Sequence, residues 1–105
     1  MNITRLNNAP KVPFDLDGHI MANHAGTEVI HLHLKPGQHI EKHTNPFDVM
    51  FYILEGKAML ESENERILVL KDQCITIPAG VNRGIDNISV NDFRLLVIKL
   101  HHTAP

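Results

Sequence analysis

At 105 residues, the chain is short enough for one domain and long enough to bury a core without disulfides or a structural metal. Ten lysines and arginines against twelve aspartates and glutamates give a formal charge of -2 with no basic cluster, which argues against nucleic acid and membrane surfaces as partners. The amino terminus has no apolar stretch of signal-peptide length, and no segment approaches the roughly 18 consecutive apolar residues of a membrane span. The single cysteine, Cys74, is expected to be a buried, inert thiol, which suits a cytoplasmic protein.

Residues 1–18 are expected to form an extended amino-terminal arm. The segment contains Pro10 and Pro13, shows little hydrophobic periodicity, and ends at the turn-forming pair Asp17 and Gly18. Arms of this kind often pack on a neighbouring subunit.

The rest of the chain alternates short apolar runs with turn residues, which is typical of β-strands. The expected strands are residues 28–34, 39–44, 49–54, 57–61, 67–70, 74–77 and 93–100. Turn signals recur every eight to twelve residues, and no segment predicts a long helix. The sequence therefore predicts a single all-β domain, a sandwich or barrel that occupies residues 28–100.

Residues 49–54 (VMFYIL) are apolar on both faces of the expected strand. One face should pack inside the barrel and the other against another segment or subunit, which favours a homodimer. Phe47, Met50 and Tyr52 are candidates for that dimer surface or for apolar contacts with a ligand. The side chains expected to fill the barrel are Val49, Phe51, Ile53, Met59, Ile75 and Ile77.

Polar side chains alternate along residues 39–45. In an extended strand His39, Glu41 and His43 share one face, and Asn45 lies close to the same line. Pointing inward, these side chains would line a polar pocket; pointing outward, they would form a solvated face.

Residues 36–56 and 72–87 resemble the two motifs of the cupins, which are small jelly-roll β-barrels also described as double-stranded β-helices. The first motif has the pattern G, five residues, H-x-H, three or four residues, E, six residues, G, and its positions are taken here by Gly37, His43, Asn45, Val49 and Gly56. The second has the pattern G, five residues, P-x-G, two residues, H, three residues, N, with Asp72, Pro78, Gly80, Arg83 and Asn87 in those places. Both spacings are kept, so the resemblance implies a jelly-roll β-barrel.

The resemblance also implies that the usual metal site is lost. Metal-binding cupins hold iron, manganese, nickel or zinc with two histidines and a glutamate from the first motif and a histidine from the second. Of these positions only His43 keeps its ligand, because Asn45 offers a neutral oxygen, Val49 has no donor atom, and Arg83 carries a permanent positive charge. No cofactor is therefore expected.

Arg83 and His43 are the residues that most suggest a binding site. A guanidinium group binds a carboxylate or phosphate with two hydrogen bonds and is costly to bury without a partner. That partner could instead be one of the chain's own acids, Glu41 or Asp48. His43 could bind a metal, act as a base or donate to an anion, or it could simply be satisfied by the barrel wall.

Three functional hypotheses follow. In the first, a homodimer binds a small organic anion, such as a carboxylate, near His43 and Arg83, with Asn45, Glu41 and His39 also lining the pocket. In the second, the protein is a metal-dependent oxygenase or isomerase that binds a divalent transition metal through His43 together with Glu41, His39 or Asp48. In the third, it is a structural or regulatory dimer without a ligand.

Four further histidines form two pairs that could in principle bind zinc. His31 and His33 share a strand face, and His101 and His102 follow the last strand. The preferred interpretation places the first pair on the barrel wall or a subunit surface and the second in a frayed terminus.

Overall fold

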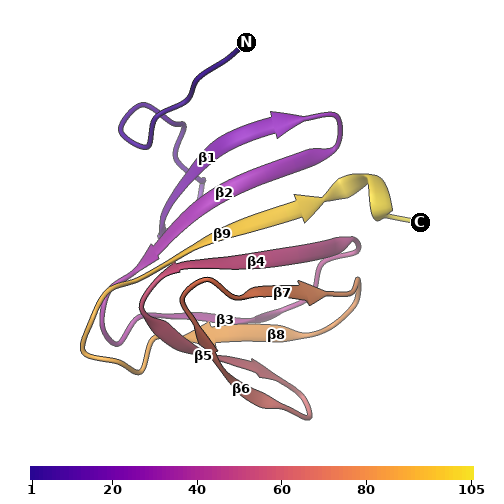
Figure 1. The fold of residues 1–105 in the computed structure, drawn as a ribbon. Helices are drawn as coiled ribbons and strands as arrows, with labels where there is room; N and C mark the ends of the chain where they lie inside the picture. The colour runs from indigo at the N-terminus through magenta and orange to yellow at the C-terminus, as the bar shows by residue number, and fades with distance from the viewer.

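The computed structural model describes residues 1–105 and contains nine strands and one short 3-10 helix (Figure 1). The elements are β1 (Asp17–His24), β2 (Thr27–Leu34), β3 (His39–His43), β4 (Asp48–Glu55), β5 (Lys57–Ser62), β6 (Arg66–Leu70), β7 (Cys74–Ile77), β8 (Arg83–Asp86), β9 (Phe93–Leu100) and η1 (His101–Thr103). One antiparallel sheet has the order β1-β2-β9-β4-β7 and the other β3-β8-β5-β6. The two sheets enclose one core, so the predicted all-β jelly-roll fold is confirmed.

The core lies between the sheets and is built by strands that alternate inward apolar with outward side chains. In β2, β9 and β4, Ile30 pairs with Val97, and Val97 pairs in turn with Phe51, so their side chains share the inner face. Val49, Phe51 and Ile53 are buried as predicted. Burial of this apolar surface between the sheets stabilises the fold.

Met59 does not fill the barrel, and this part of the prediction was wrong. Its neighbours Ala58 and Leu60 are the buried residues of β5. Because successive side chains of a strand point to opposite faces, Met59 points outward. Ile77 is buried as predicted, and Ile75 is half-buried against the core.

The outer face of the five-stranded sheet carries apolar side chains as well. Met50 and Tyr52 alternate with the buried residues of β4 and are half-buried on this face. Met50 pairs with Ile98, which pairs in turn with Val29, and the three form one outward row across the sheet. Met50 and Tyr52 therefore lie outside the barrel, so of their two predicted roles only that of a subunit contact is sterically open to them.

The amino-terminal arm is shorter than predicted and packs on the barrel of its own chain. Asp17 and Gly18 do not form a turn but begin β1. The Ile20 backbone N–H donates to the Pro10 carbonyl oxygen at 2.7 Å, and Val12 is part of the buried core. A Cβ at Gly18 would lie 2.9 Å from Val12 Cγ2 of the arm and 2.6 Å from Leu32 Cδ2 of β2, so glycine at this position leaves room for both side chains.

Two local predictions also need correction. Cys74 is exposed rather than buried, because Ile77 faces the core and Cys74, three residues before it on β7, faces solvent. Strand β8 was not predicted, since it has only four residues and contains Gly84. Of the two missed strands, β1 and β8, the second contributes Arg83 to the site described below.

The carboxyl terminus is held in place rather than frayed. The Thr103 hydroxyl accepts a hydrogen bond from the Asp48 backbone N–H at 2.8 Å and donates one to the Leu100 carbonyl oxygen at 2.7 Å. The His101 ring packs on Phe47 with 4.2 Å between ring centroids. The chain has no helix with the length and apolar character needed to cross a lipid bilayer.

Candidate functional site

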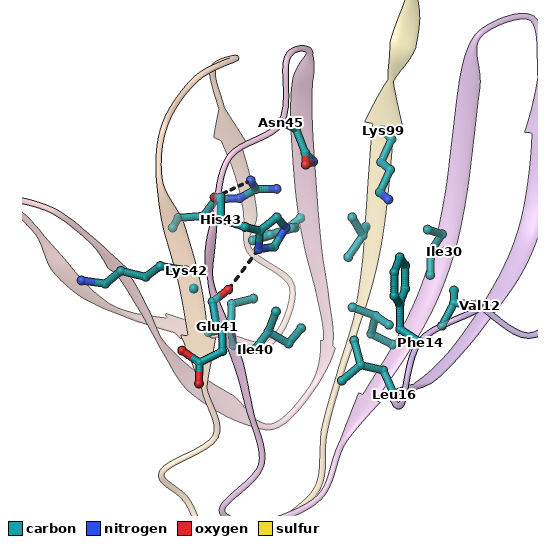
Figure 2. Close-up of a pocket in the computed structure, with 16 residues that line it drawn as sticks. Val12, Phe14, Leu16, Ile30, Ile40, Glu41, Lys42, His43, Asn45 and Lys99 are labelled. Carbon is teal, nitrogen blue, oxygen red and sulfur yellow. Dashed lines mark hydrogen bonds between the residues drawn. The ribbon is translucent and has the colours of Figure 1, made fainter.

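A cavity of about 360 Å³ opens between the two sheets of the barrel. It is lined by 16 residues, nine of them hydrophobic, which is the size and composition of a small-molecule site. One wall comes from the amino-terminal arm, β2 and β9, and the opposite wall comes from β3 and β8 (Figure 2). Its wall also carries charged side chains, those of Glu41, Lys42, Arg83 and Lys99.

A β-bulge in β3 decides which side chains of the histidine-rich strand enter the cavity. Ile40 pairs with Ile85 and His43 with Arg83, so β3 has one more residue than β8 between these two pairs. As a result His43 shares the inner face with Ile40. His39, which precedes the bulge, stays on the outer face.

His39 and Glu41 therefore do not enter the cavity with His43, as a regular strand would require. Their side chains are 57% and 88% exposed, and the His39 ring nitrogen Nε2 donates to Glu41 Oε1 at 2.7 Å. Glu41 borders the cavity, but its carboxylate points away from it (Figure 2). Of the two residues, Glu41 thus borders the cavity as predicted without directing its carboxylate into it, and His39 does not line the cavity.

Gly84 allows β3 to form this bulge. A Cβ at Gly84 would lie 2.6 Å from the Ile40 carbonyl oxygen and 3.0 Å from the Lys42 backbone nitrogen. The bulged backbone thus crosses the space that any other side chain at position 84 would fill. Gly84 and the bulge together position His43.

Arg83 is buried in the cavity wall, with 3% of its surface exposed. Its NH1 donates to the His43 carbonyl oxygen at 3.1 Å, and its guanidinium carbon lies 5.9 Å from the centre of the Phe51 ring. The Asn45 amide is satisfied on both sides when its oxygen faces Arg83. In that orientation the oxygen accepts from Arg83 NH2 at 3.2 Å, and the nitrogen donates to the Thr44 carbonyl oxygen at 3.1 Å. All of these partners are neutral.

No acidic residue pairs with Arg83, contrary to the alternative that Glu41 or Asp48 would do so. Asp48 Oδ1 instead accepts from the Ala79 backbone N–H at 2.9 Å, and Glu41 is bound to His39. The Nε of Arg83 is buried without a hydrogen-bond partner. Burial lowers the pKa of the Arg83 guanidinium, because the charged form loses its hydration.

A backbone contact determines which ring nitrogen of His43 is free. Its Nδ1 lies 3.0 Å from the Glu41 carbonyl oxygen, and a carbonyl oxygen can only accept, so Nδ1 carries the proton. In the neutral ring Nε2 then has the lone pair. His43 can accept a hydrogen bond from a ligand, or donate one to an anion after it is protonated.

Lys99, Phe14 and Leu16 also line the cavity and were missed in the sequence. Lys99 follows Val97 by two residues on β9, so the alternation of the strand could have placed its side chain inside. Its Nζ lies 4.0 Å from Glu28 Oε1. Phe14 and Leu16 could not be found in this way, because the arm has no strand periodicity.

The residues around the cavity do not fit a transition metal. No group of three or more His, Cys, Asp or Glu side chains comes together anywhere in the structure. At the cavity the available donors are the single imidazole of His43 and the amide of Asn45, beside the cationic Arg83. The ligand sets that combine His43 with His39, Glu41 or Asp48 do not assemble.

The other histidines lie outside the cavity and do not form a zinc site. His33 Nδ1 lies 3.1 Å from Asp17 Oδ2, and its Nε2 lies 3.3 Å from Asp92 Oδ2. His31 Nε2 accepts from Arg94 NH1 at 3.0 Å. These two histidines are on the outer wall of the barrel, as the preferred interpretation had it, and they do not meet the carboxyl-terminal pair.

Two positions of the second motif, Asp72 and Asn87, have structural roles. Asp72, where the motif has glycine, adopts a left-handed backbone conformation with a φ of 66°. Asn87 is fully buried, and its Nδ2 donates to the Leu34 and Asn91 carbonyl oxygens at 3.1 and 2.9 Å. Asn87 thereby fixes the loop that leads into β9.

Two solved structures and one relative by sequence are similar to this chain. A protein from Thermus thermophilus is 25% identical with a TM-score of 0.80, and the match covers 100% of both chains. A predicted oxalate decarboxylase from Thermotoga maritima has a TM-score of 0.84 at 13% identity over 95% of this chain and 99% of that one. The tetracenomycin polyketide synthase protein TcmJ of Streptomyces glaucescens is 28% identical over 58 residues, which are 54% of this chain and only 39% of that protein.

Residues 30–99 match the sequence profile of the Cupin domain family, and they include both motifs and the strands that carry the cavity. With the jelly-roll topology, this match assigns the chain to a family: it belongs to the cupins.

Proposed function

We propose that this cupin binds a small organic anion, a carboxylate, in the barrel cavity, and that Arg83 holds the charged group. The observation that carries the proposal is a buried guanidinium at the cavity wall that has no acidic partner. A buried charge without a counter-charge is costly to maintain, and a bound anion offsets that cost. An arginine fork also matches the geometry of a carboxylate.

The surroundings of Arg83 support an anion rather than a cation. Lys99, whose Nζ lies 4.0 Å from Glu28 Oε1, places a second ammonium or guanidinium group on the cavity wall. Glu41, the one acidic residue of that wall, directs its carboxylate away from the cavity (Figure 2). His43 and Asn45 add hydrogen-bonding groups beside the guanidinium. The binding we propose uses these protein groups and no metal held by the usual motif.

Thermal denaturation in the presence of carboxylic acids and their amides tests the proposal. We expect acids to raise the melting temperature in a concentration-dependent way, because a ligand that binds only the folded state stabilises it. The corresponding neutral amides should have a much smaller effect. Equal stabilisation by acid and amide would contradict the assignment of the charge to Arg83.

Three arginine variants make the test specific. Arg83→Met should abolish the stabilisation by acids, and Arg83→Lys should weaken it, because lysine keeps the charge but loses the two-point fork. Arg66→Met is the matched control, since Arg66 is exposed on β6 and pairs with Glu61 at 3.0 Å, away from the cavity. The control variant should bind acids as the unmodified protein does.

A further inference from the structure

The cavity has two ends of different chemistry. Figure 2 shows His43 and Lys99 toward one end, while Ile40 and Leu16 lie toward the other. Arg83 belongs to the polar end, because its NH1 contacts the His43 carbonyl oxygen at 3.1 Å. A ligand with its charge at Arg83 must therefore extend its remaining atoms along an apolar wall.

The amino-terminal arm builds much of the apolar end. Val12, Phe14 and Leu16 all line the cavity, although they precede the first strand. The arm is fastened to the barrel by two backbone hydrogen bonds: Val12 N–H donates to the Gly18 carbonyl oxygen at 2.9 Å, and Ile20 N–H donates to the Pro10 carbonyl oxygen at 2.7 Å. The apolar wall is thus part of the folded protein and exists before a ligand binds.

Phe14 is the least covered side chain of this wall. It is 66% exposed, although it is a large aromatic residue that borders a cavity, and Figure 2 shows its ring beside the cavity opposite Ile40. Exposed aromatic surface of this kind is favourable to cover with an apolar group. Carbon atoms of a ligand placed between Phe14 and Ile40 would bury the exposed surface of the Phe14 ring.

The arrangement of charge distinguishes a monoanion from a dianion. Of the three cationic residues that border the cavity, Arg83 and Lys99 lie at the polar end, and the Lys42 side chain points away from the cavity (Figure 2). The apolar end therefore has no group that could pair with a second carboxylate. An ionised group there would lose its hydration without compensation. A short dianion such as oxalate would leave the apolar end empty.

From these observations we infer that the ligand is an amphiphilic monocarboxylate, with its carboxylate at Arg83 and an aliphatic or aromatic body between the amino-terminal arm and the barrel. The inference rests on the proposed function, because it takes Arg83 as the anion site, and it adds the class of molecule that the site selects. Phe14 and Leu16 then act as residues that determine specificity.

Calorimetric titration with a series of acids tests the inference. The probes are butanoate, hexanoate, octanoate and 3-phenylpropanoate, with oxalate and succinate as dianions and 3-phenylpropanamide as the neutral control. We expect affinity to rise about fourfold for each added CH₂ group until the apolar end is filled, the equivalent of ~0.8 kcal/mol per group. 3-Phenylpropanoate should bind at least tenfold more tightly than succinate.

Variants of the arm and of Arg83 separate the two parts of the idea. Phe14→Ser, at an exposed position where the fold tolerates the change, should weaken octanoate and 3-phenylpropanoate severalfold and leave butanoate nearly unchanged. Arg83→Met should remove the binding of every acid. Melting curves of each variant show whether it is folded before titration.

Each outcome decides a different point. If succinate and oxalate bind as tightly as 3-phenylpropanoate, and Arg83→Met still removes binding, the amphiphilic class is wrong and the anion site stands. If Phe14→Ser leaves all affinities unchanged, the arm does not contact the ligand and the inference fails. If no acid binds, or if the amide binds as well as the acid, the proposed function itself fails.

Discussion

Arg83 lies opposite His43 in the pairing of β3 with β8, and its NH1 donates to the His43 carbonyl oxygen at 3.1 Å. The bond joins the two cupin motifs at the cavity wall. It also holds the guanidinium in one position without using up its charge, because a carbonyl oxygen is neutral. A ligand would thus meet a fork that is already oriented, which lowers the entropic cost of binding.

Arg83→Met should make the protein more stable while it removes anion binding. Methionine has a similar length and no charge, so the variant no longer buries an unpaired cation. We expect the free energy of unfolding to rise by about 1 kcal/mol, which corresponds to a melting temperature higher by roughly 4–8 °C for a domain of this size. Thermal and urea denaturation without ligand provide the measurement; a loss of stability would show that Arg83 serves mainly the fold.

Gly84→Ala should disturb the site through the backbone of β3. The new methyl group would meet the Ile40 carbonyl oxygen at 2.6 Å, so β3 must shift and His43 must move with it. Overpacking of this kind costs about 1–3 kcal/mol. We expect a lower melting temperature and at least tenfold weaker binding of acids by calorimetry.

Gly37→Ala is the matched control for this change. A Cβ at Gly37 meets nothing within 4 Å, and the cost is confined to its φ of 82°. The control should lose some stability and keep its affinity for acids. If both variants bind acids equally well, the bulge does not position the site.

His31 should make stability decrease as the pH falls below about 6.5. Burial and, to a lesser degree, the nearby Arg94 lower the pKa of His31, which favours the neutral ring that accepts from Arg94 NH1. The unfolded chain then binds a proton that the folded chain excludes, so stability is lost from the unfolded pKa downward until the pH passes below the lowered pKa. Above about pH 6.5 the effect of this residue should vanish.

The comparison with His31→Gln isolates this effect from the neighbouring groups Asp17, His19 and His33, which also act on His31. Glutamine can still accept from Arg94 but does not titrate. We expect the difference in melting temperature between the two proteins to change between pH 7 and pH 5 in favour of the variant. Parallel curves over that range would show that His31 is not responsible.

We expect a homodimer that covers the outer face of the five-stranded sheet. Val29, Ile98 and Met50 form an apolar row on this face, which would otherwise be in contact with water. Met50→Lys and Ile98→Lys should shift the mass measured by light scattering from two chains to one. Leu68→Lys, on the outer side of the other sheet, should leave the mass unchanged, and a monomeric unmodified protein would contradict the expectation.

The fold was largely predictable because its signals are local. The alternation of apolar and polar residues located β2, β4 and β9 to within a residue or two, and the two motif spacings identified the jelly roll. Two strands, β1 and β8, were not predicted from the sequence. Both contain glycine and several polar residues, and both depend on pairing with neighbouring strands for stability. Their formation is a consequence of sheet pairing, which no short segment encodes by itself.

Which side chains of the histidine-rich strand β3 enter the cavity could not be predicted from the local sequence. The sequence alone determined that residues 39–45 carry polar side chains at alternating positions and that Arg83 replaces a metal ligand, because residue types and spacings are written in the chain. Only the tertiary structure decided that His43 enters the cavity while His39 and Glu41 turn outward, since the bulge over Gly84 reverses the alternation. It also decided that Arg83 has no acidic partner and that the arm supplies the apolar wall, because both depend on contacts between residues far apart in the sequence.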